Sequence, residues 1–342
     1  MANGERVLVT GAGGFIAKHC VGELLRQGYR VRGTLRRPQA GAEVAAAVGV
    51  ADPGRLDFVM ADLTADAGWD EAMRDCAYLM HVASPFPLGV PRSRQALLPA
   101  ARDGTRRVLA AAARAGVRRT VLTSSIVAIY AVERPAGHVY AEQDWSDTDR
   151  PTLPPYPLSK TLAERAAWEF AGADRSGMQL AVINPGFVLG PALDRDVGTS
   201  AEVIRLFLSS GYPAVPRLGY PVVDVRDLAI AHVAALQQAE AAGERFICTA
   251  ETLWLIDFSR ILMTEFPRLR RKLPKFELPD FAVRLAAVFD RRLRATLSDL
   301  GQSRRVSSAK AERLLGVRFR PAREAVVAMA RSLIELGLVK PA

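Results

Sequence analysis

Short apolar stretches alternate with longer segments of helical periodicity along the first half of the chain. The apolar stretches predict strands at residues 6–10, 29–35, 56–61, 78–83, 119–124 and 179–184. Strands that alternate with helices in this way are typical of a parallel sheet with helices on both faces. We therefore predict an α/β fold built on a doubly wound parallel sheet.

The second half of the chain departs from this alternation. Proline and glycine gather at residues 184–198 and again at 211–221, where we expect loops that lead the chain away from the sheet. Further on, residues 281–300 predict one amphipathic helix with apolar side chains such as Leu285 and Phe289. We expect that helix to cover the core or a substrate cleft rather than to anchor in a membrane.

The first predicted strand runs into a turn of small residues and then into a helix. Gly11, Gly14 and Ala17 mark the spacing of this turn. Glycines here let the backbone approach a pyrophosphate, which then rests at the positive end of the helix dipole. An ordinary strand-to-helix turn has a similar sequence, but the residues that follow favour the dinucleotide site of a Rossmann-type fold.

The second predicted strand ends in two arginines, Arg36 and Arg37. Arginines also occupy ordinary loops in a chain as rich in arginine as this one. At this point of a dinucleotide site, however, an acidic residue binds the ribose 2′-hydroxyl of NAD, whereas an arginine pairs with the 2′-phosphate of NADP. The sequence therefore favours NADP(H) as the cofactor, with NAD(H) as the alternative.

Tyr156 and Lys160 stand four positions apart in a segment that we expect to be helical. This spacing puts both side chains on one face of a helix. A phenol titrates near pH ~10, so it exchanges a proton near neutrality only when its phenolate is stabilised, and a neighbouring ammonium does this. The pair predicts a tyrosine that exchanges a proton with a substrate.

Together, these features resemble the extended short-chain dehydrogenase/reductase superfamily, also called the NAD-dependent epimerase/dehydratase superfamily. Within it the chain is similar to the branch of dihydroflavonol reductases, cinnamoyl-CoA reductases and related microbial aldehyde or ketone reductases. The resemblance spans nearly the whole chain. Its further landmarks are residues 61–63, 81–85, 123–125, 156–164 and 184–191.

The resemblance implies two interleaved domains. The dinucleotide-binding Rossmann domain is expected at residues 1–184, with a return segment near 222–245. A smaller, mostly C-terminal substrate-binding domain is expected at residues 185–221 and 246–342.

The resemblance also assigns roles to individual residues. Ser125 is expected to bind the substrate carbonyl oxygen, Tyr156 to donate the proton, and Lys160 to lower the pKa of the phenol and to bind the nicotinamide ribose. The other cofactor contacts that it implies are Thr10, Gly11, Gly14, Phe15, Ile16, Arg36, Arg37, Asp62, Leu63, Val82, Ala83, Ser84, Thr123, Ser124, Pro185, Gly186 and Val188.

The substrate pocket is the part that the sequence determines least. Plant flavonoid reductases of this branch hold flavonoid hydroxyls with an asparagine where this chain has Tyr130, so we do not expect a polyhydroxylated flavonoid. Tyr130 itself is a candidate substrate contact, and Phe187, Phe207 and Tyr212 are apolar candidates for lining the cleft, or else ordinary core residues. These residues predict a hydrophobic or aromatic aldehyde or ketone.

We therefore predict an NADP-dependent carbonyl reductase or alcohol dehydrogenase. A 3β-hydroxysteroid dehydrogenase and a nucleotide-sugar epimerase stay open as alternatives, although Arg36 suits the NAD of an epimerase poorly. A nucleotide-sugar dehydratase would need an acidic pair beside Ser125, where Ile126 and Val127 stand. A noncatalytic, nucleotide-sensing regulator would not need Tyr156.

Composition narrows the range of partners. The chain has 342 residues and a net charge of +10, and residues 268–340 hold 18 basic against 7 acidic residues. Because no nucleic-acid-binding motif accompanies this excess, we expect a solvated basic face. The scattered cysteines and histidines predict neither disulfides nor a metal site. No apolar run approaches the roughly 20 residues of a membrane span, and no secretory signal is evident. We expect a cytoplasmic monomer or homodimer that acts on a small-molecule carbonyl or alcohol, without nucleic-acid or membrane partners.

Overall fold

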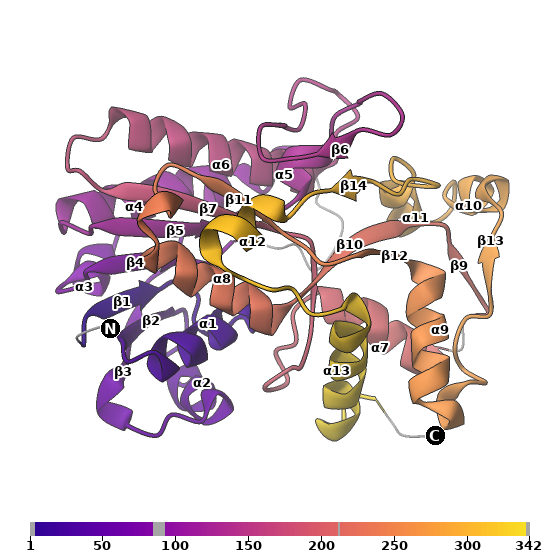
Figure 1. The fold of residues 1–342 in the computed structure, drawn as a ribbon, viewed down its shortest axis with the longest axis horizontal. Coiled ribbons are helices and arrows are strands. Elements are labelled where there is room, and N and C mark those ends of the chain that lie inside the picture. The colour runs from indigo at the N-terminus through magenta and orange to yellow at the C-terminus, as the bar shows by residue number, and fades with distance from the viewer. Residues whose placement is uncertain (1–3, 85–92, 211–212, 340–342) are drawn as a thin grey trace.

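The computed structural model describes residues 4–84, 93–210 and 213–339. Within these ranges the core is a sheet of seven parallel strands in the order β11-β7-β5-β4-β1-β2-β3 (Figure 1). The strands are β1 (Arg6–Val9), β2 (Arg30–Leu35), β3 (Leu56–Met60), β4 (Tyr78–His81), β5 (Arg119–Thr123), β7 (Gln179–Pro185) and β11 (Arg245–Cys248). The first six lie where the apolar stretches predicted them, so the predicted doubly wound parallel sheet is confirmed.

Side chains alternate between the two faces of the sheet along each strand, and this alternation determines which helices they contact. Val7 and Val9 of β1 belong to the apolar core on one face of the sheet, whereas Leu8 between them packs into the core on the other face. Successive residues of a strand point to opposite faces, so a strand of consecutive apolar residues is buried on both sides. One face carries α1 (Phe15–Arg26), α2 (Ala40–Val48) and α8 (Val225–Gln237), and the other carries α3 (Trp69–Met73), α4 (Gly104–Arg114) and α6 (Pro155–Ala173).

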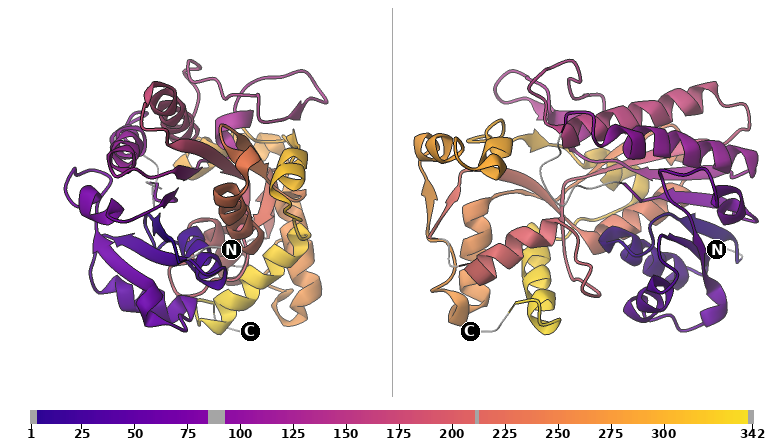
Figure 2. Two further views of the ribbon diagram at one scale, coloured as in Figure 1. Left: turned by 60° about the vertical axis from the view of Figure 1, so that its left-hand side comes forward. Right: turned by 180° about the vertical axis from the view of Figure 1, so that it is seen from behind.

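A smaller unit lies beyond the carboxyl ends of the central strands. It contains a three-stranded sheet in the order β12-β10-β8, against which a group of helices packs. Figure 2 shows the helices of this unit gathered at the end of the molecule away from the N-terminus. Its main elements are β8 (Phe187–Leu189), α7 (Ser200–Ser210), β10 (Gly219–Asp224), β12 (Thr252–Trp254), α9 (Leu255–Glu265) and α13 (Ala322–Glu335).

The chain returns from this unit to the central sheet through α8 and β11. The strand pairing changes near both ends of the predicted return segment, near 222–245. Residues 222–224 pair with β8 in the small sheet, and the return begins where the Asp224 side chain caps the N-terminus of α8. Residues 246–248, which we assigned to the substrate domain, pair with β7 in the central sheet.

Shorter elements connect these parts. Strand β6 (Val139–Tyr140) pairs with β14 (Arg305–Val306), and β9 (Ala214–Pro216) pairs with β13 (Phe276–Leu278). The short helices are η1 (Pro53–Arg55), the π-helical η2 (Pro99–Asp103), α5 (Val127–Tyr130), η3 (Ala239–Ala241), η4 (Pro267–Leu269) and α12 (Ala309–Leu315). In the described part of the chain, no helix has the length and apolar character needed to cross a bilayer.

The single helix predicted at residues 281–300 is interrupted. It forms α10 (Asp280–Ala286) and α11 (Arg291–Thr296), with a turn between them. In that turn the Arg294 guanidinium donates a hydrogen bond of 2.6 Å to the carbonyl oxygen of Val288. Because a side chain satisfies this carbonyl, the chain can leave the helix without an unpaired acceptor.

The two short helices and their turn, residues 280–296, form a surface that we name the tip. Among the described side chains of the tip, Val283 is fully buried and Ala287 is 2% exposed, but four large apolar side chains do not cover a core or cleft, so the prediction is wrong for these four. These exposed side chains are Phe281 (74%), Leu285 (66%), Val288 (59%) and Phe289 (87%).

Candidate active site

The start of α6 carries two of the predicted catalytic residues. Pro155 occupies the first turn of the helix, where a missing N–H is no loss and the fixed φ angle suits the helix. Tyr156 and Lys160 follow on one face of this helix. Lys160 is buried, and its Nζ donates to the carbonyl oxygen of Thr123, at the end of β5, over 3.5 Å. The helix therefore presents the pair to the carboxyl end of the sheet.

The third predicted catalytic residue, Ser125, lies two positions after the end of β5. Its side chain forms a hydrogen bond with the Tyr156 phenol, and Ser125 is only 7% exposed. The structure thus brings together the three residues, which the sequence separates by about thirty positions. A serine hydroxyl and a phenol side by side provide two polar groups for one substrate oxygen.

Burial determines the protonation of the predicted catalytic pair, Tyr156 and Lys160. It raises the pKa of Tyr156 to about 12, an effect that the hydrogen bond from Ser125 opposes. Burial lowers the pKa of Lys160 to about 8, while the nearby Glu164 carboxylate acts in the opposite direction. At neutral pH the phenol therefore keeps its proton and the amine is mostly an ammonium, which is the arrangement that a tyrosine proton donor requires.

The glycine turn after β1 fits a dinucleotide. Helix α1 begins with Gly14 as its N-cap, without a side-chain cap and without an acidic residue in its first turn, so its first N–H groups are open to an anion. Gly11 has φ +63°, and a Cβ there would lie 3.0 Å from the Ala83 Cβ. Phe15 and Ile16 follow as the first residues of α1, with Phe15 packed into the core. The backbone, rather than side chains, forms this cradle.

Thr10 joins the glycine turn to the end of β4. It is fully buried, and its Oγ1 accepts a hydrogen bond from the backbone N–H of Ala83 over 2.9 Å. The same oxygen lies 2.8 Å from Nδ1 of His81, whose pKa burial lowers to about 3. A neutral histidine thus helps to fix the loop, while Val82 and Ser84 are partly exposed beside it. In this arrangement Thr10 holds the cradle in shape.

The ends of β2 and β3 form the opposite side of the predicted cofactor site. Arg36 and Arg37 are both exposed where β2 ends. Asp62 accepts hydrogen bonds from the N–H and hydroxyl of Thr64, which lower its pKa, and the charge of Arg36 acts in the same direction. Leu63 is partly exposed next to it. These positions leave two cationic side chains available for a phosphate.

The segment predicted to meet the nicotinamide lies where β7 passes into β8. A Cβ on Gly186 would lie 2.3 Å from the carbonyl oxygen of Pro221, so only glycine fits this crossing. The carbonyl oxygen of Pro185 accepts a hydrogen bond from the N–H of Ile126, and Val188 is buried in the core. The segment thereby fixes the backbone next to Ser125, and its contact with a nicotinamide stays a prediction.

The two hydroxyls that precede Ser125, at and just after the end of β5, are hydrogen-bonded to protein groups. Oγ1 of Thr123 lies 2.7 Å from Nε2 of His232, and Oγ of Ser124 donates to the Glu164 carboxylate over 2.5 Å. Any contact of Thr123 or Ser124 with the cofactor would therefore use the backbone. Of the three consecutive hydroxyls, that of Ser125 is the one beside Tyr156.

The predicted substrate contacts have different surroundings. The partly exposed ring of Phe187 lies 5.0 Å from that of Tyr220. Tyr130 is 9% exposed, with the Arg304 guanidinium 4.7 Å from the centre of its ring. Phe207 is buried in the core, which is the alternative that the sequence left open. Tyr212 lies outside the described residues.

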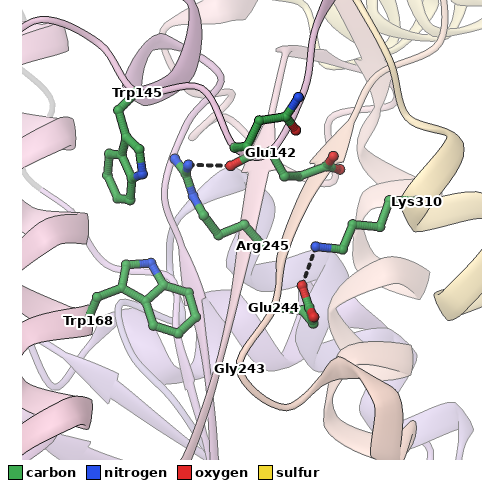
Figure 3. Close-up of a pocket in the computed structure, with 8 residues that line it drawn as sticks. Glu142, Trp145, Trp168, Gly243, Glu244, Arg245 and Lys310 are labelled. Carbon is green, nitrogen blue, oxygen red and sulfur yellow. Dashed lines mark hydrogen bonds and ion pairs between the residues drawn. The ribbon is translucent and has the colours of Figure 1, made fainter.

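A groove of about 440 Å³ opens elsewhere, beside α6 and the start of β11 (Figure 3). Trp145, Trp168 and Arg245 line it, and Lys310 forms an ion pair with Glu244 at its edge. None of the residues predicted for the site lines this groove. Among the described residues, no cluster of three or more His, Cys, Asp or Glu could hold a metal ion.

Sequence reasoning missed three buried polar residues beside the catalytic group, namely Glu164, Asn184 and Arg245. One signal was present, because Glu164 follows Lys160 by four positions and so shares its face of α6. Arg245 begins β11, the edge strand of the sheet, and is buried there in spite of its charge. No local pattern links Arg245 to Glu164, which lies 81 positions away.

A parallel doubly wound sheet, an open helix N-terminus after a glycine turn, and a serine, tyrosine and lysine at the same edge define an NAD(P)-dependent oxidoreductase of alcohol and carbonyl groups. The profile of the NAD dependent epimerase/dehydratase family matches residues 7–248. The chain therefore belongs to this family, that of the extended short-chain dehydrogenases/reductases, as the sequence resemblance predicted.

Relatives of known name cover most of the chain. The NADPH-dependent methylglyoxal reductase of Saccharomyces cerevisiae is 30% identical, covering 94% of this chain and 95% of its own. Cinnamoyl-CoA reductase 1 of Petunia hybrida is 35% identical, with 78% of each chain covered. The crystal structure of yeast methylglyoxal/isovaleraldehyde reductase complexed with NADPH superposes with a TM-score of 0.82 at 28% identity, over 97% of this chain and 99% of that one. Vestitone reductase from alfalfa shares the fold, with a TM-score of 0.75 at 23% identity, covering 98% of this chain and 99% of its own.

Proposed function

We propose that this protein is an NADPH-dependent carbonyl reductase that acts on hydrophobic or aromatic aldehydes or ketones. The observation that carries the proposal is the grouping of Ser125, Tyr156 and Lys160 at the carboxyl edge of the sheet. Open α/β sheets bind their ligands at that edge, where the strand order reverses, and here β1 has β2 on one side and β4 on the other.

The cofactor is NADP(H), as the sequence predicted. The yeast relative is NADPH-dependent by name, and the solved yeast reductase is complexed with NADPH. In this chain the open N-terminus of α1 suits a pyrophosphate, and the exposed Arg36 and Arg37 suit a 2′-phosphate. When bound, NADPH supplies the hydride that reduces the carbonyl carbon.

The chain's own residues handle the carbonyl oxygen. Ser125 and Tyr156 donate hydrogen bonds to it, which stabilises the negative charge that develops as the carbonyl is reduced. Tyr156 then gives its proton to that oxygen, and the Lys160 ammonium stabilises the phenolate that is left. The proton needed for the alcohol thus comes from a group that is protonated at neutral pH.

Aromatic side chains near the site support a hydrophobic substrate. Phe187 follows Gly186 at the predicted nicotinamide segment, and its ring is stacked obliquely with that of Tyr220. Phe258 packs behind the same ring at 6.1 Å. The relatives named for methylglyoxal, isovaleraldehyde and cinnamoyl-CoA are consistent with a small or aromatic carbonyl compound.

The test measures oxidation of NADPH and, separately, of NADH with aromatic, aliphatic, steroid and 2-oxo carbonyl compounds. We expect turnover with NADPH that falls by about 10²-fold or more in Tyr156→Phe, since positioned proton donors contribute about 10²–10⁴-fold. Tyr140→Phe is the matched control, because the Tyr140 phenol is bonded to a loop carbonyl, that of Val132. Turnover of steroids alone would favour the steroid dehydrogenase. Cofactor binding without any turnover would contradict the proposal and favour the epimerase or the regulator.

A further inference from the structure

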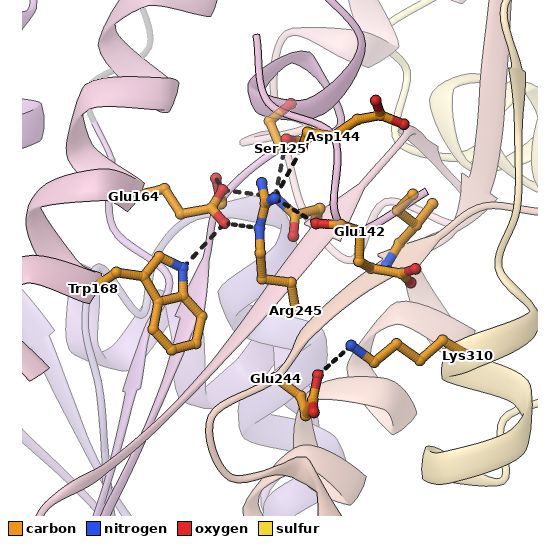
Figure 4. A network of polar contacts seen from close by, with 11 residues as sticks. Ser125, Glu142, Asp144, Glu164, Trp168, Glu244, Arg245 and Lys310 are labelled. Atoms are coloured by element: carbon orange, nitrogen blue, oxygen red, sulfur yellow. Dashed lines mark hydrogen bonds and ion pairs between the residues drawn. The ribbon is translucent and has the colours of Figure 1, made fainter. Parts of the chain in front are cut away.

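We propose that Glu164 is a positioning residue of this reductase, which fixes Ser125 and the catalytic face of α6 relative to each other through a buried network with Asn184 and Arg245. The inference rests on the proposed function. Figure 4 shows this network, which runs from Ser125 to the groove beside Trp168.

Glu164 joins the catalytic helix to β5. It is fully buried on α6, four residues after Lys160. One carboxylate oxygen accepts hydrogen bonds from the Ser124 hydroxyl over 2.5 Å and from Nδ2 of Asn184 over 2.8 Å. A carboxylate that accepts two hydrogen bonds from two neighbouring strands holds its helix in one register against them.

Asn184 links Glu164 to Ser125 through hydrogen bonds to both residues. Its Nδ2 also donates to the backbone carbonyl oxygen of Ser125 over 3.2 Å. Each of the two amide protons thus has an acceptor, one on Glu164 and the other on Ser125. The orientation of the Asn184 amide, and with it the position of the Ser125 backbone, depends on the acceptor that Glu164 supplies.

Arg245 makes the buried charge of Glu164 tolerable. Its Nε donates to the second carboxylate oxygen over 2.5 Å, and its Nη1 donates to the backbone carbonyl of Glu142 over 2.6 Å. The guanidinium lies 3.7 Å from the centre of the Trp145 ring, and the side chain is 8% exposed. A buried carboxylate is costly unless it is paired and hydrogen-bonded, so this partner allows an anion to remain next to the site.

The same anion acts on Lys160. The charged or titratable groups that face the ammonium are Glu164 from α6 and the neutral His81 from β4, and the Thr123 carbonyl of β5 accepts its hydrogen bond. Of these, Glu164 is the one that raises the pKa of Lys160. Loss of its charge should therefore move the deprotonation of Lys160 to lower pH.

The decisive variant is Glu164→Gln, which keeps the shape of the side chain and removes its charge. We expect kcat to fall by about 10²-fold, the loss typical of a misplacement of about 1 Å at a reacting centre. The KM for the carbonyl compound and the dissociation constant for NADPH, measured by fluorescence titration, should change by less than about twofold, because uniform binding is kept. The alkaline limb of the pH profile of kcat should move to lower pH.

Two further variants separate positioning from stability. Asp227→Asn breaks another buried carboxylate–arginine pair, with Arg320, away from the site, so it should lower Tm and leave kcat and its pH profile unchanged. Glu164→Gln/Arg245→Met leaves no unpaired charge and should regain Tm, since a neutral replacement of a buried pair is tolerated. Its kcat should stay low.

The outcomes are distinguishable. If kcat of Glu164→Gln equals that of the wild type, or recovers together with Tm in the double variant, Glu164 has only a structural role and the positioning proposal is wrong. If the wild type itself shows no turnover that depends on Tyr156, the proposed function fails, and the positioning role fails with it.

Discussion

The region around Ser125, Lys160 and Glu164, which we name the catalytic corner, differs from the tip in which side chains are exposed to solvent. In the corner, polar residues lie inside the protein, with Ser125 and Lys160 each 7% exposed and Glu164 fully buried. In the tip, large apolar residues such as Phe281 and Phe289 lie outside, 74% and 87% exposed. Each region departs from the usual rule that polar groups face water and apolar groups face the core.

The difference lies in what holds each region. In the corner, the Glu164 carboxylate on α6 accepts hydrogen bonds from residues at the end of β5, on β7 and on β11. Several independent contacts therefore fix the position of α6 relative to the sheet. In the tip, α10 and α11 are short helices, and among the described side chains Val283 and Ala287 are the buried apolar ones. Activity should therefore be sensitive to the change of a single atom in the corner, whereas the tip should tolerate the replacement of whole side chains with little change in stability.

Lys160 gives the largest expected effect, because one substitution should change activity and stability in opposite directions. In the proposed mechanism the Lys160 ammonium stabilises the phenolate, so kcat of Lys160→Met should fall by about 10²-fold or more. In the wild type, burial lowers the pKa of Lys160 from 10.5 to about 8. Between these values the unfolded state binds more protons than the folded state, so the contribution of Lys160 to stability rises with pH there and is least favourable below pH 8.

Lys160→Met removes that cost. At pH 7 the variant should be more stable than the wild type by up to about 3 kcal/mol, since each pKa unit corresponds to about 1.4 kcal/mol. The gain should shrink as the pH approaches 10. Urea unfolding at pH 7 and pH 9.5 measures this gain in the free energy of unfolding. A variant that is less stable than the wild type at pH 7 would show that burial of the Lys160 ammonium does not destabilise the folded protein.

The corner was partly predictable from sequence because two of its features are local. The spacing of Tyr156 and Lys160 and the apolar stretches of the strands each follow from a period of the backbone. The choice of Ser125 among three hydroxyls followed from the resemblance, and the structure gives the other two hydroxyls protein partners. The pairing of Glu164 with Arg245 was not predictable, because it joins residues that only the folded sheet brings together.

In the tip, the sequence pattern was read correctly but did not predict which side chains would be buried. The apolar period at residues 281–300 was real, but periodicity gives no sign of what the apolar face will meet. The helix ends in the middle of the pattern, and the Arg294 side chain donates a hydrogen bond to the carbonyl oxygen of Val288 in the turn that follows. The outcome depended on a contact within the folded segment, which competes with helix propagation and has no signature in composition.

Replacing the two arginines at the end of β2 should have an effect of intermediate size, on the binding of the cofactor. Arg36→Ala/Arg37→Ala should raise the dissociation constant of NADPH by roughly tenfold to a hundredfold, because hydrogen bonds to charged groups contribute about 1.5–3 kcal/mol. The constant for NADH should change little. Arg30→Ala, at the opposite end of the same strand and also exposed, is the matched control. Equal losses for the two cofactors in a fluorescence titration would contradict recognition of the 2′-phosphate.

The tip should give the smallest effect. Phe281→Ser/Phe289→Ser should change the free energy of unfolding by no more than about 0.5 kcal/mol, as exposed substitutions usually do, and should leave kcat unchanged. Val283→Ala, on the buried side of the same helix, should cost about 2 kcal/mol because it removes apolar contacts from a filled site. Urea unfolding at two protein concentrations measures both variants. A loss from the serine pair as large as that from Val283→Ala, or one that grows with protein concentration, would mean that the phenylalanines are covered in solution, and the contrast between the tip and the catalytic corner would then disappear.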